Sequence, residues 1–145
     1  MSLPTITPEQ VVAAARGWRD VPYVHQGRSR AGVDCAGLVI MVAHELGASS
    51  FDVADYGRYP SRDRMRELMR SLCSECTGEP LPGMVAMMQF TGEPRHLGIV
   101  VAYRHGGVAL VHALQAAGRV AEHRIDALWR SRITALFEMP GVKRV

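Results

Sequence analysis

Cys35 is the residue whose type and position most favour nucleophilic chemistry. It follows Asp34, which is suited to cap a helix, and the sequence predicts that a helix begins at Cys35. The positive end of a helix favours negative charge, so it would stabilise a thiolate there. The free N–H groups at the same helix end could also bind an oxyanion. A second interpretation stays open, in which Cys35 is a small buried residue that packs the helix.

Two histidines could supply and orient the general base that such a nucleophile needs. His96 opens an apolar strand, and a rigid strand end suits a general base. His112 lies within the next predicted strand, where its polar ring needs a hydrogen-bonding partner. A hairpin that pivots at position 106 puts both rings on one sheet face but about 13 Å apart, and a turn centred one residue earlier would halve that distance. His112 therefore either fixes the orientation and tautomer of His96 or is a core histidine whose hydrogen bonds are made elsewhere in the fold.

The remaining cysteines and histidines are not expected to take part in the chemistry. Cys73 and Cys76 form one CxxC pair without a second pair of ligands, so no metal site is expected. A redox pair usually lies at a helix start, whereas this pair ends a predicted helix, which favours packing over disulfide exchange. The pattern assigns the other histidines to a loop, a helix surface, a turn and a strand: His25, His44, His105 and His123.

The elements that must position these residues change in kind along the chain. Thr7 is suited to cap a helix that has Pro8 at its first position, with Gln10 closing a capping box, and residues 11–18 continue this helix. Further helices are expected from 35 up to Gly47 and over 61–74, with a loop over 20–33. Strands are expected over 84–90, 97–104, 108–114, 119–124 and 133–139. Helices followed by closely connected strands predict an α+β domain with an antiparallel sheet. The length of 145 residues suits one domain over residues 1–145.

Composition narrows the functional classes. The chain is 48% hydrophobic and 21% charged with a net charge of +3, as in ordinary globular proteins. Arginines alternate with acidic residues over 62–70, so nucleic-acid binding is not expected. Apolar runs fall short of the roughly 20 residues that a membrane span needs. The first ten residues lack a basic region and an apolar core, so we expect synthesis in the cytoplasm without a secretory signal.

Four segments in order resemble the NlpC-type family of bacterial cell-wall cysteine peptidases. The family's Pro-Tyr loop and Asp-Cys-x-Gly nucleophile motif are similar to VPYVHQGRSRAGVDCAGLV. Its catalytic histidine segment is similar to RHLGIVV, and its third, polar residue lies in a segment similar to LVHA. The closing helix and strand of its phage-associated branch are similar to LWRSRITALFEMP.

The resemblance implies a papain-like core, in which N-terminal helices carry the nucleophile at a helix N-terminus and pack on an antiparallel sheet. It implies hydrolysis of an amide in the peptide stem of peptidoglycan, typically next to D-glutamate, by Cys35, His96 and His112. It also implies that Tyr23 positions substrate or stabilises the oxyanion and that Asp34 contacts the substrate amine. Neither a metal nor an organic cofactor is implied. Beside Pro22, Tyr23 has the alternative of a partly buried loop aromatic.

Two departures from the family pattern keep other functions open. Ala36 stands where the family often has serine, and Met84 stands where a strand often begins with aspartate. One alternative is a non-catalytic or assembly component of a phage tail, and another is a cysteine acyltransferase on the same core. A redox protein that uses its CxxC pair is the third. The phage-associated branch would add tail proteins as partners and a virion location from which the enzyme acts on the cell wall.

Overall fold

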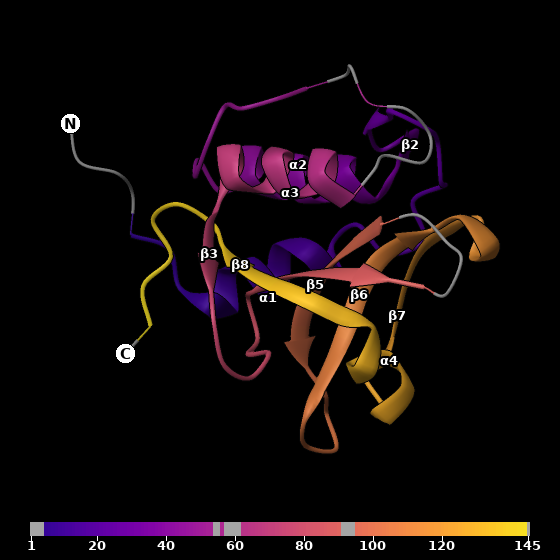
Figure 1. Cartoon of the computed structure of the whole chain (residues 1–145). Coiled ribbons are helices and arrows are strands. Elements are labelled where there is room, and N and C mark those ends of the chain that lie inside the picture. Colours follow the sequence, from indigo (N-terminus) through magenta and orange to yellow (C-terminus); the bar gives the residue numbers. More distant parts are fainter. Residues whose placement is uncertain (1–4, 54–55, 57–61, 91–94, 145) are drawn as a thin grey trace.

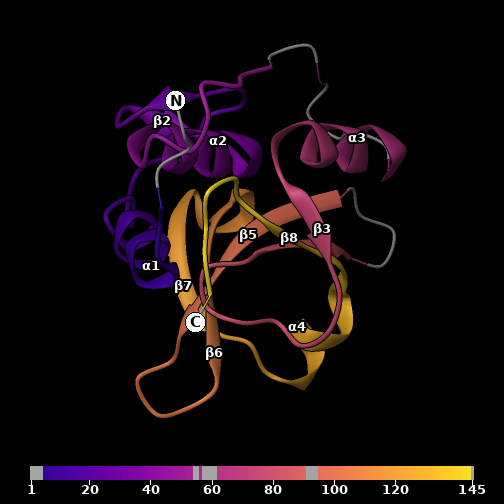
Figure 2. The ribbon, with the colours of Figure 1, turned by 90° about the vertical axis from the view of Figure 1, so that its left-hand side faces the viewer.

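The helices lie on both sides of an antiparallel sheet. The computed structural model describes residues 5–53, 56, 62–90 and 95–144. Helices α1 to α3 cover one face of the sheet, and the short helix α4 covers part of the other (Figures 1 and 2). This arrangement confirms the expected α+β class. The helices are α1 (Pro8–Arg16), α2 (Cys35–Glu45), α3 (Arg62–Leu72) and α4 (Ala127–Arg132).

Local capping sets the ends of the first two helices. The Thr7 hydroxyl accepts a hydrogen bond from the Gln10 backbone N–H and the Gln10 side chain accepts one from the Thr7 backbone N–H, so α1 begins at Pro8 with the expected capping box. Asp34 caps α2 by accepting from the Gly37 N–H at 2.7 Å. Gly47 ends α2 with φ +70°, and its N–H and that of the next residue bond back to the last turn.

The structure contains all five expected strands, and three further short strands were not expected. The strands are β1 (Arg28–Ser29), β2 (Gly32–Val33), β3 (Ser74–Cys76), β4 (Val85–Gln89), β5 (Arg95–Ala102), β6 (Val108–Leu114), β7 (Arg119–Arg124) and β8 (Ile133–Glu138). The larger sheet runs in the order β3-β8-β4-β5-β6-β7, and β1 pairs with β2 in a small hairpin. The expected loop over 20–33 therefore carries a hairpin, and the second CxxC cysteine lies in an edge strand.

Alternation along the strands divides the apolar residues between two cores. Side chains such as Met87, Ile99 and Val111 pack with helices α1 to α3 in the larger core. Side chains of the opposite phase, such as Val100 and Leu110, form a smaller core that Trp129 of α4 covers. Cys73 is buried in the larger core, as the packing interpretation predicts, and Cys76 is partly buried beside the smaller one.

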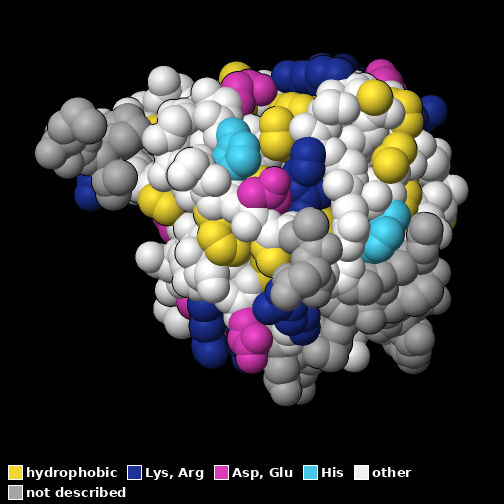
Figure 3. Space-filling view, turned by 90° about the horizontal axis from the view of Figure 1, so that it is seen from above, with side chains coloured by type: hydrophobic (Ala, Val, Ile, Leu, Met, Phe, Trp, Pro, Cys, Tyr) yellow, Lys and Arg dark blue, Asp and Glu magenta, His cyan; other side chains and the backbone are white. Residues whose placement is uncertain are grey.

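The described surface carries mixed charge. Seen from above, Lys and Arg side chains are interspersed with acidic and hydrophobic ones on the described part of that face (Figure 3). Within the described residues, no helix is long and apolar enough to cross a membrane.

Candidate active site

Cys35 lies where the first turn of α2 meets the beginning of β5. Its sulfur is within hydrogen-bonding reach of the backbone N–H groups of Leu97, Ala36 and Cys35 itself. The thiol is partly buried against the larger core. The fold therefore places the sulfur beside the residue that follows His96, among N–H donors from both elements.

The charge state of Cys35 differs from the expected thiolate. Burial, together with the nearby negative charge of Asp34, raises the pKa of Cys35 to about 12, although the three backbone N–H groups act to lower it. The N-terminal end of the helix is present as predicted, but burial has the larger effect on the pKa of Cys35. The resting side chain is therefore a neutral thiol, and a base would have to take its proton before the sulfur could act as a nucleophile.

His96 is a buried, neutral imidazole held by His112. It lies inside β5, opposite Met88 of β4, and its Nε2 is 2.7 Å from Nδ1 of His112. Burial lowers the pKa of His96 to about 4, with a smaller contribution from the charge of His123. At neutral pH the ring is unprotonated, which a general base requires. Because Nε2 bonds to His112, Nδ1 is the nitrogen left to accept a proton.

The register of β5 and β6 brings the two histidines together. Ile99 pairs with Val111 and Ala102 with Val108, so the hairpin pivots at position 105 and not at 106. This is the earlier turn on which the contact of His96 with His112 depends. The two rings are diagonal neighbours on one sheet face, a spacing that long side chains bridge. His112 is fully buried, and burial lowers its pKa to about 2, with contributions from the charges of His96 and His123.

Gly98 provides the space in which the two rings meet. A Cβ at this position would lie 2.7 Å from Leu110 Cδ1 and 3.1 Å from His112 Cβ. Both side chains would have to move, because the smaller core offers them little room.

Gly98→Ala is therefore expected to lower the free energy of unfolding by about 1–3 kcal/mol through overpacking. Chemical denaturation measures the change. Gly17→Ala serves as a control, because the nearest atom to its new Cβ would be the Ala14 carbonyl oxygen at 3.3 Å. Equal stability of the two variants would contradict a tight fit around His112.

His123 belongs to the site although the sequence assigned it no role. Its Nε2 is 2.8 Å from Nε2 of His112, and its Nδ1 is 3.0 Å from the Arg124 carbonyl oxygen. His112 pairs with Ala121 in β7, so His123 is its diagonal neighbour on the same face. The turn at Gly118 together with strict alternation could have indicated this contact, because both follow from the sequence.

Asp34 is the centre of a buried polar network next to Cys35. It is 3% exposed and accepts from the Gln26 N–H at 2.8 Å and from the Tyr56 hydroxyl at 2.9 Å. Arg28 approaches its other oxygen at 3.4 Å and also donates to the Tyr56 hydroxyl. Sequence reasoning did not anticipate Arg28 and Tyr56, because their meeting depends on the β1–β2 hairpin and on the loop after α2. The expected contact of Asp34 with a substrate amine stays a prediction.

Tyr23 lies in the Pro-Tyr segment, which runs beside the start of β7. Its N–H donates to the Gly118 carbonyl at 2.9 Å, and it bridges to Val33, the residue before Asp34. The ring is partly buried against the larger core. This location is compatible with either expected role of Tyr23, and its action on substrate stays a prediction.

The arrangement combines a thiol, an oriented neutral base and backbone N–H donors. These are the parts that acyl transfer through a covalent thioester requires. Among the described residues, no cluster of three histidine, cysteine or acidic side chains is suited to hold a metal ion.

Known proteins share this fold. The model of the NlpC/P60 family matches residues 20–137. The NlpC/p60 domain of the peptidoglycan hydrolase SagA is 19% identical with a TM-score of 0.65, covering 92% of this chain and all of that one (100%). An N-acetylmuramoyl-L-alanine amidase from Bacteroides uniformis is 14% identical with a TM-score of 0.63, covering 92% and 98%.

A longer protein aligns over part of its length. The NlpC/P60 family protein from Bacillus cereus is 14% identical with a TM-score of 0.64, and the match covers 93% of this chain but 41% of that one. No curated protein sequence matches the chain. At these identities the solved structures show the fold, and the family model covers most of the sequence. The chain therefore belongs to the NlpC/P60 family.

Proposed function

We propose that this protein hydrolyses an amide bond in the peptide stem of bacterial peptidoglycan. The observation that carries the proposal is the 2.7 Å contact between His96 and His112, next to a thiol at the start of a helix. Family membership supports it, as do two structural neighbours described as a peptidoglycan hydrolase and as an N-acetylmuramoyl-L-alanine amidase.

The reaction begins from a neutral thiol and a neutral imidazole. Nδ1 of His96 takes the proton as the Cys35 sulfur attacks the amide carbonyl. Backbone N–H groups at the start of α2 stabilise the oxyanion, and the Tyr23 hydroxyl adds a further donor. His96 then gives its proton to the leaving amine. Water, activated by His96, hydrolyses the thioester and restores the thiol.

The negative charge of Asp34 suits a contact with a cationic substrate amine. Its oxygens already accept from Gln26, Gly37 and Tyr56. A substrate amine would therefore have to compete with these donors for the buried carboxylate. Association with phage tails and a virion location stay predictions drawn from the closing segment alone.

The decisive experiment identifies the products. Purified stem peptides are incubated with the protein in ¹⁸O-labelled water, and the products are analysed by mass spectrometry. We expect two fragments whose masses name the bond, with ¹⁸O in the new carboxylate. Protein alkylated at Cys35, confirmed by peptide mapping, serves as the control and should be inactive.

The same experiment separates hydrolysis from its alternatives. An acyltransferase would leave the acyl fragment joined to an added amine, without ¹⁸O. Failure of folded protein to cleave any stem peptide, together with failure of an electrophilic probe to label Cys35, would refute the enzymatic proposal.

A further inference from the structure

The hydrogen bonds of three histidines form one continuous chain. It runs from His96 Nε2 to His112 Nδ1, and from His112 Nε2 to His123 Nε2. The chain ends where His123 Nδ1 meets the Arg124 carbonyl oxygen at 3.0 Å. A neutral imidazole has one donor nitrogen and one acceptor nitrogen, so each contact restricts the next.

The carbonyl at the end of the chain decides the direction of every bond. A carbonyl oxygen only accepts, so Nδ1 of His123 carries a proton, and in the neutral ring Nε2 is then an acceptor. His112 must then donate from Nε2, which leaves its Nδ1 as an acceptor for the Nε2–H of His96. The consequence is that Nδ1 of His96 holds a free lone pair, the form that a base for Cys35 needs.

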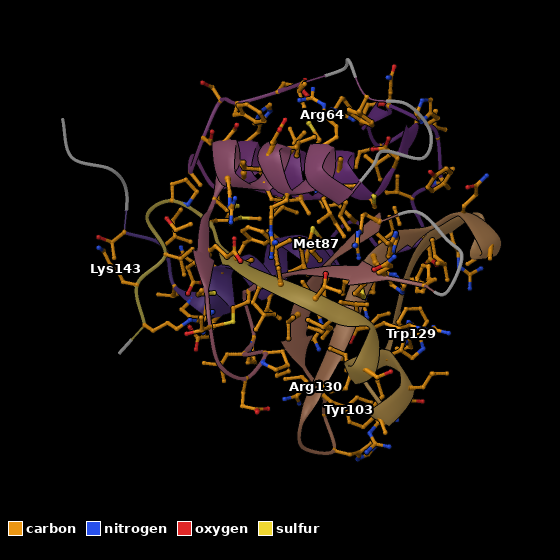
Figure 4. The ribbon with its side chains drawn as sticks, in the orientation of Figure 1. Arg64, Met87, Tyr103, Trp129, Arg130 and Lys143 are labelled. Carbon is orange, nitrogen blue, oxygen red and sulfur yellow. The ribbon has the colours of Figure 1, made fainter. Side chains whose placement is uncertain are left out.

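Packing holds His123 in this position. The Trp129 ring of α4 lies 4.5 Å from the His123 ring and 5.3 Å from the His112 ring, between centroids. Figure 4 labels Trp129 beside α4 and the neighbouring strands. Asp126 caps α4 by accepting from the Trp129 N–H, which fixes the tryptophan. Leu110 is the residue of β6 that pairs with His123.

Without an acceptor at position 123, the direction of the chain is no longer fixed. The buried His112 would keep an unpaired Nε2–H or move its proton to Nδ1. A proton on Nδ1 would force His96 to accept at Nε2 and to carry its own proton on Nδ1. His96 in that tautomer cannot take a proton from the thiol.

We propose that His123 is a positioning residue that, anchored on the Arg124 carbonyl, sets the tautomer of the base His96 through His112. The inference rests on the proposed function for its catalytic consequence, but the tautomers themselves do not depend on it.

Long-range ¹H–¹⁵N correlation spectra of histidine-labelled protein test the chain directly. In the wild type we expect protons on Nε2 of His96, Nε2 of His112 and Nδ1 of His123. Any other pattern at neutral pH would overturn the proposal, whether or not the protein cleaves stem peptides. Absence of cleavage with the expected tautomers would refute the proposed function alone.

Two variants form a matched pair. His123→Phe keeps a ring beside Trp129 but removes the acceptor, whereas His123→Gln places an amide oxygen where Nε2 lay. We expect His123→Phe to lower kcat by about 10- to 100-fold with little change in KM, and to populate the Nδ1–H tautomer of His96. His123→Gln should restore both to near the wild-type values. Unchanged kcat and unchanged tautomer in folded His123→Phe would overturn the proposal, and the wild-type spectrum decides it if this variant does not fold.

Discussion

Cys35→Ala is expected to lower kcat/KM for the cleaved stem peptide by at least about 10⁴-fold. The alanine has no nucleophile, and water would have to attack the amide without a thioester intermediate. The alanine side chain fits the partly buried site, so circular dichroism should show an unchanged fold. Product formation followed by liquid chromatography and mass spectrometry measures the loss.

A second thiol in the chain provides a matched control. Cys76→Ala removes a partly buried cysteine in β3, outside the site, and should leave kcat/KM within about threefold of the wild type. If Cys76→Ala abolished cleavage and Cys35→Ala did not, Cys35 would not be the nucleophile.

His96 and Cys35 should also act as a unit. His96→Ala is expected to lose activity on the same scale as Cys35→Ala, and the double variant should be no worse than either single one. Additive losses would mean that the two side chains contribute to separate steps.

Much of the fold could be predicted because local rules agree with the tertiary structure. The Thr7 cap sets the start of α1, and the Asp34 cap sets the start of α2. Gly118 separates β6 from β7, and the bounds of both strands match the expected ones. The β1–β2 hairpin and β3 escaped prediction because strands of two or three residues are too short to show alternation. These short strands form because the folded chain places a partner strand beside each of them.

The electrostatics of the candidate site could not be predicted from the sequence. Sequence position selected Cys35, His96 and His112 as candidates, and the structure brings the two histidines into contact, while their catalytic roles stay predictions. The helix end at Cys35 favours a thiolate, but burial beside Asp34 reverses the net direction of the pKa, and burial cannot be inferred from a motif. His123 was assigned to a strand without a role, because its link to His96 depends on two registers: β6–β7 brings it to His112, and β5–β6 brings His112 to His96.

The buried histidines should make the protein sensitive to acid. The pKa of His96 is lowered to about 4 and that of His112 to about 2, whereas histidine in an unfolded chain titrates near 6.5. Between these values the unfolded state binds protons that the folded state does not, so stability is complete above about pH 6.5 and falls as the pH is lowered. The two histidines together should therefore lower the free energy of unfolding between pH 7 and pH 4.5.

Urea denaturation at a series of pH values measures this loss. His105→Gln, which changes a turn residue, should keep the full pH dependence of the free energy of unfolding. His112→Leu should reduce the slope of this free energy against pH by the equivalent of about one proton. A free energy of unfolding that changes by less than about 1 kcal/mol over this range would show that the histidines are protonated in the folded state. The same burial that keeps His96 neutral as a base is then the reason that the folded protein tolerates acid poorly, because both effects follow from excluding water around one ring.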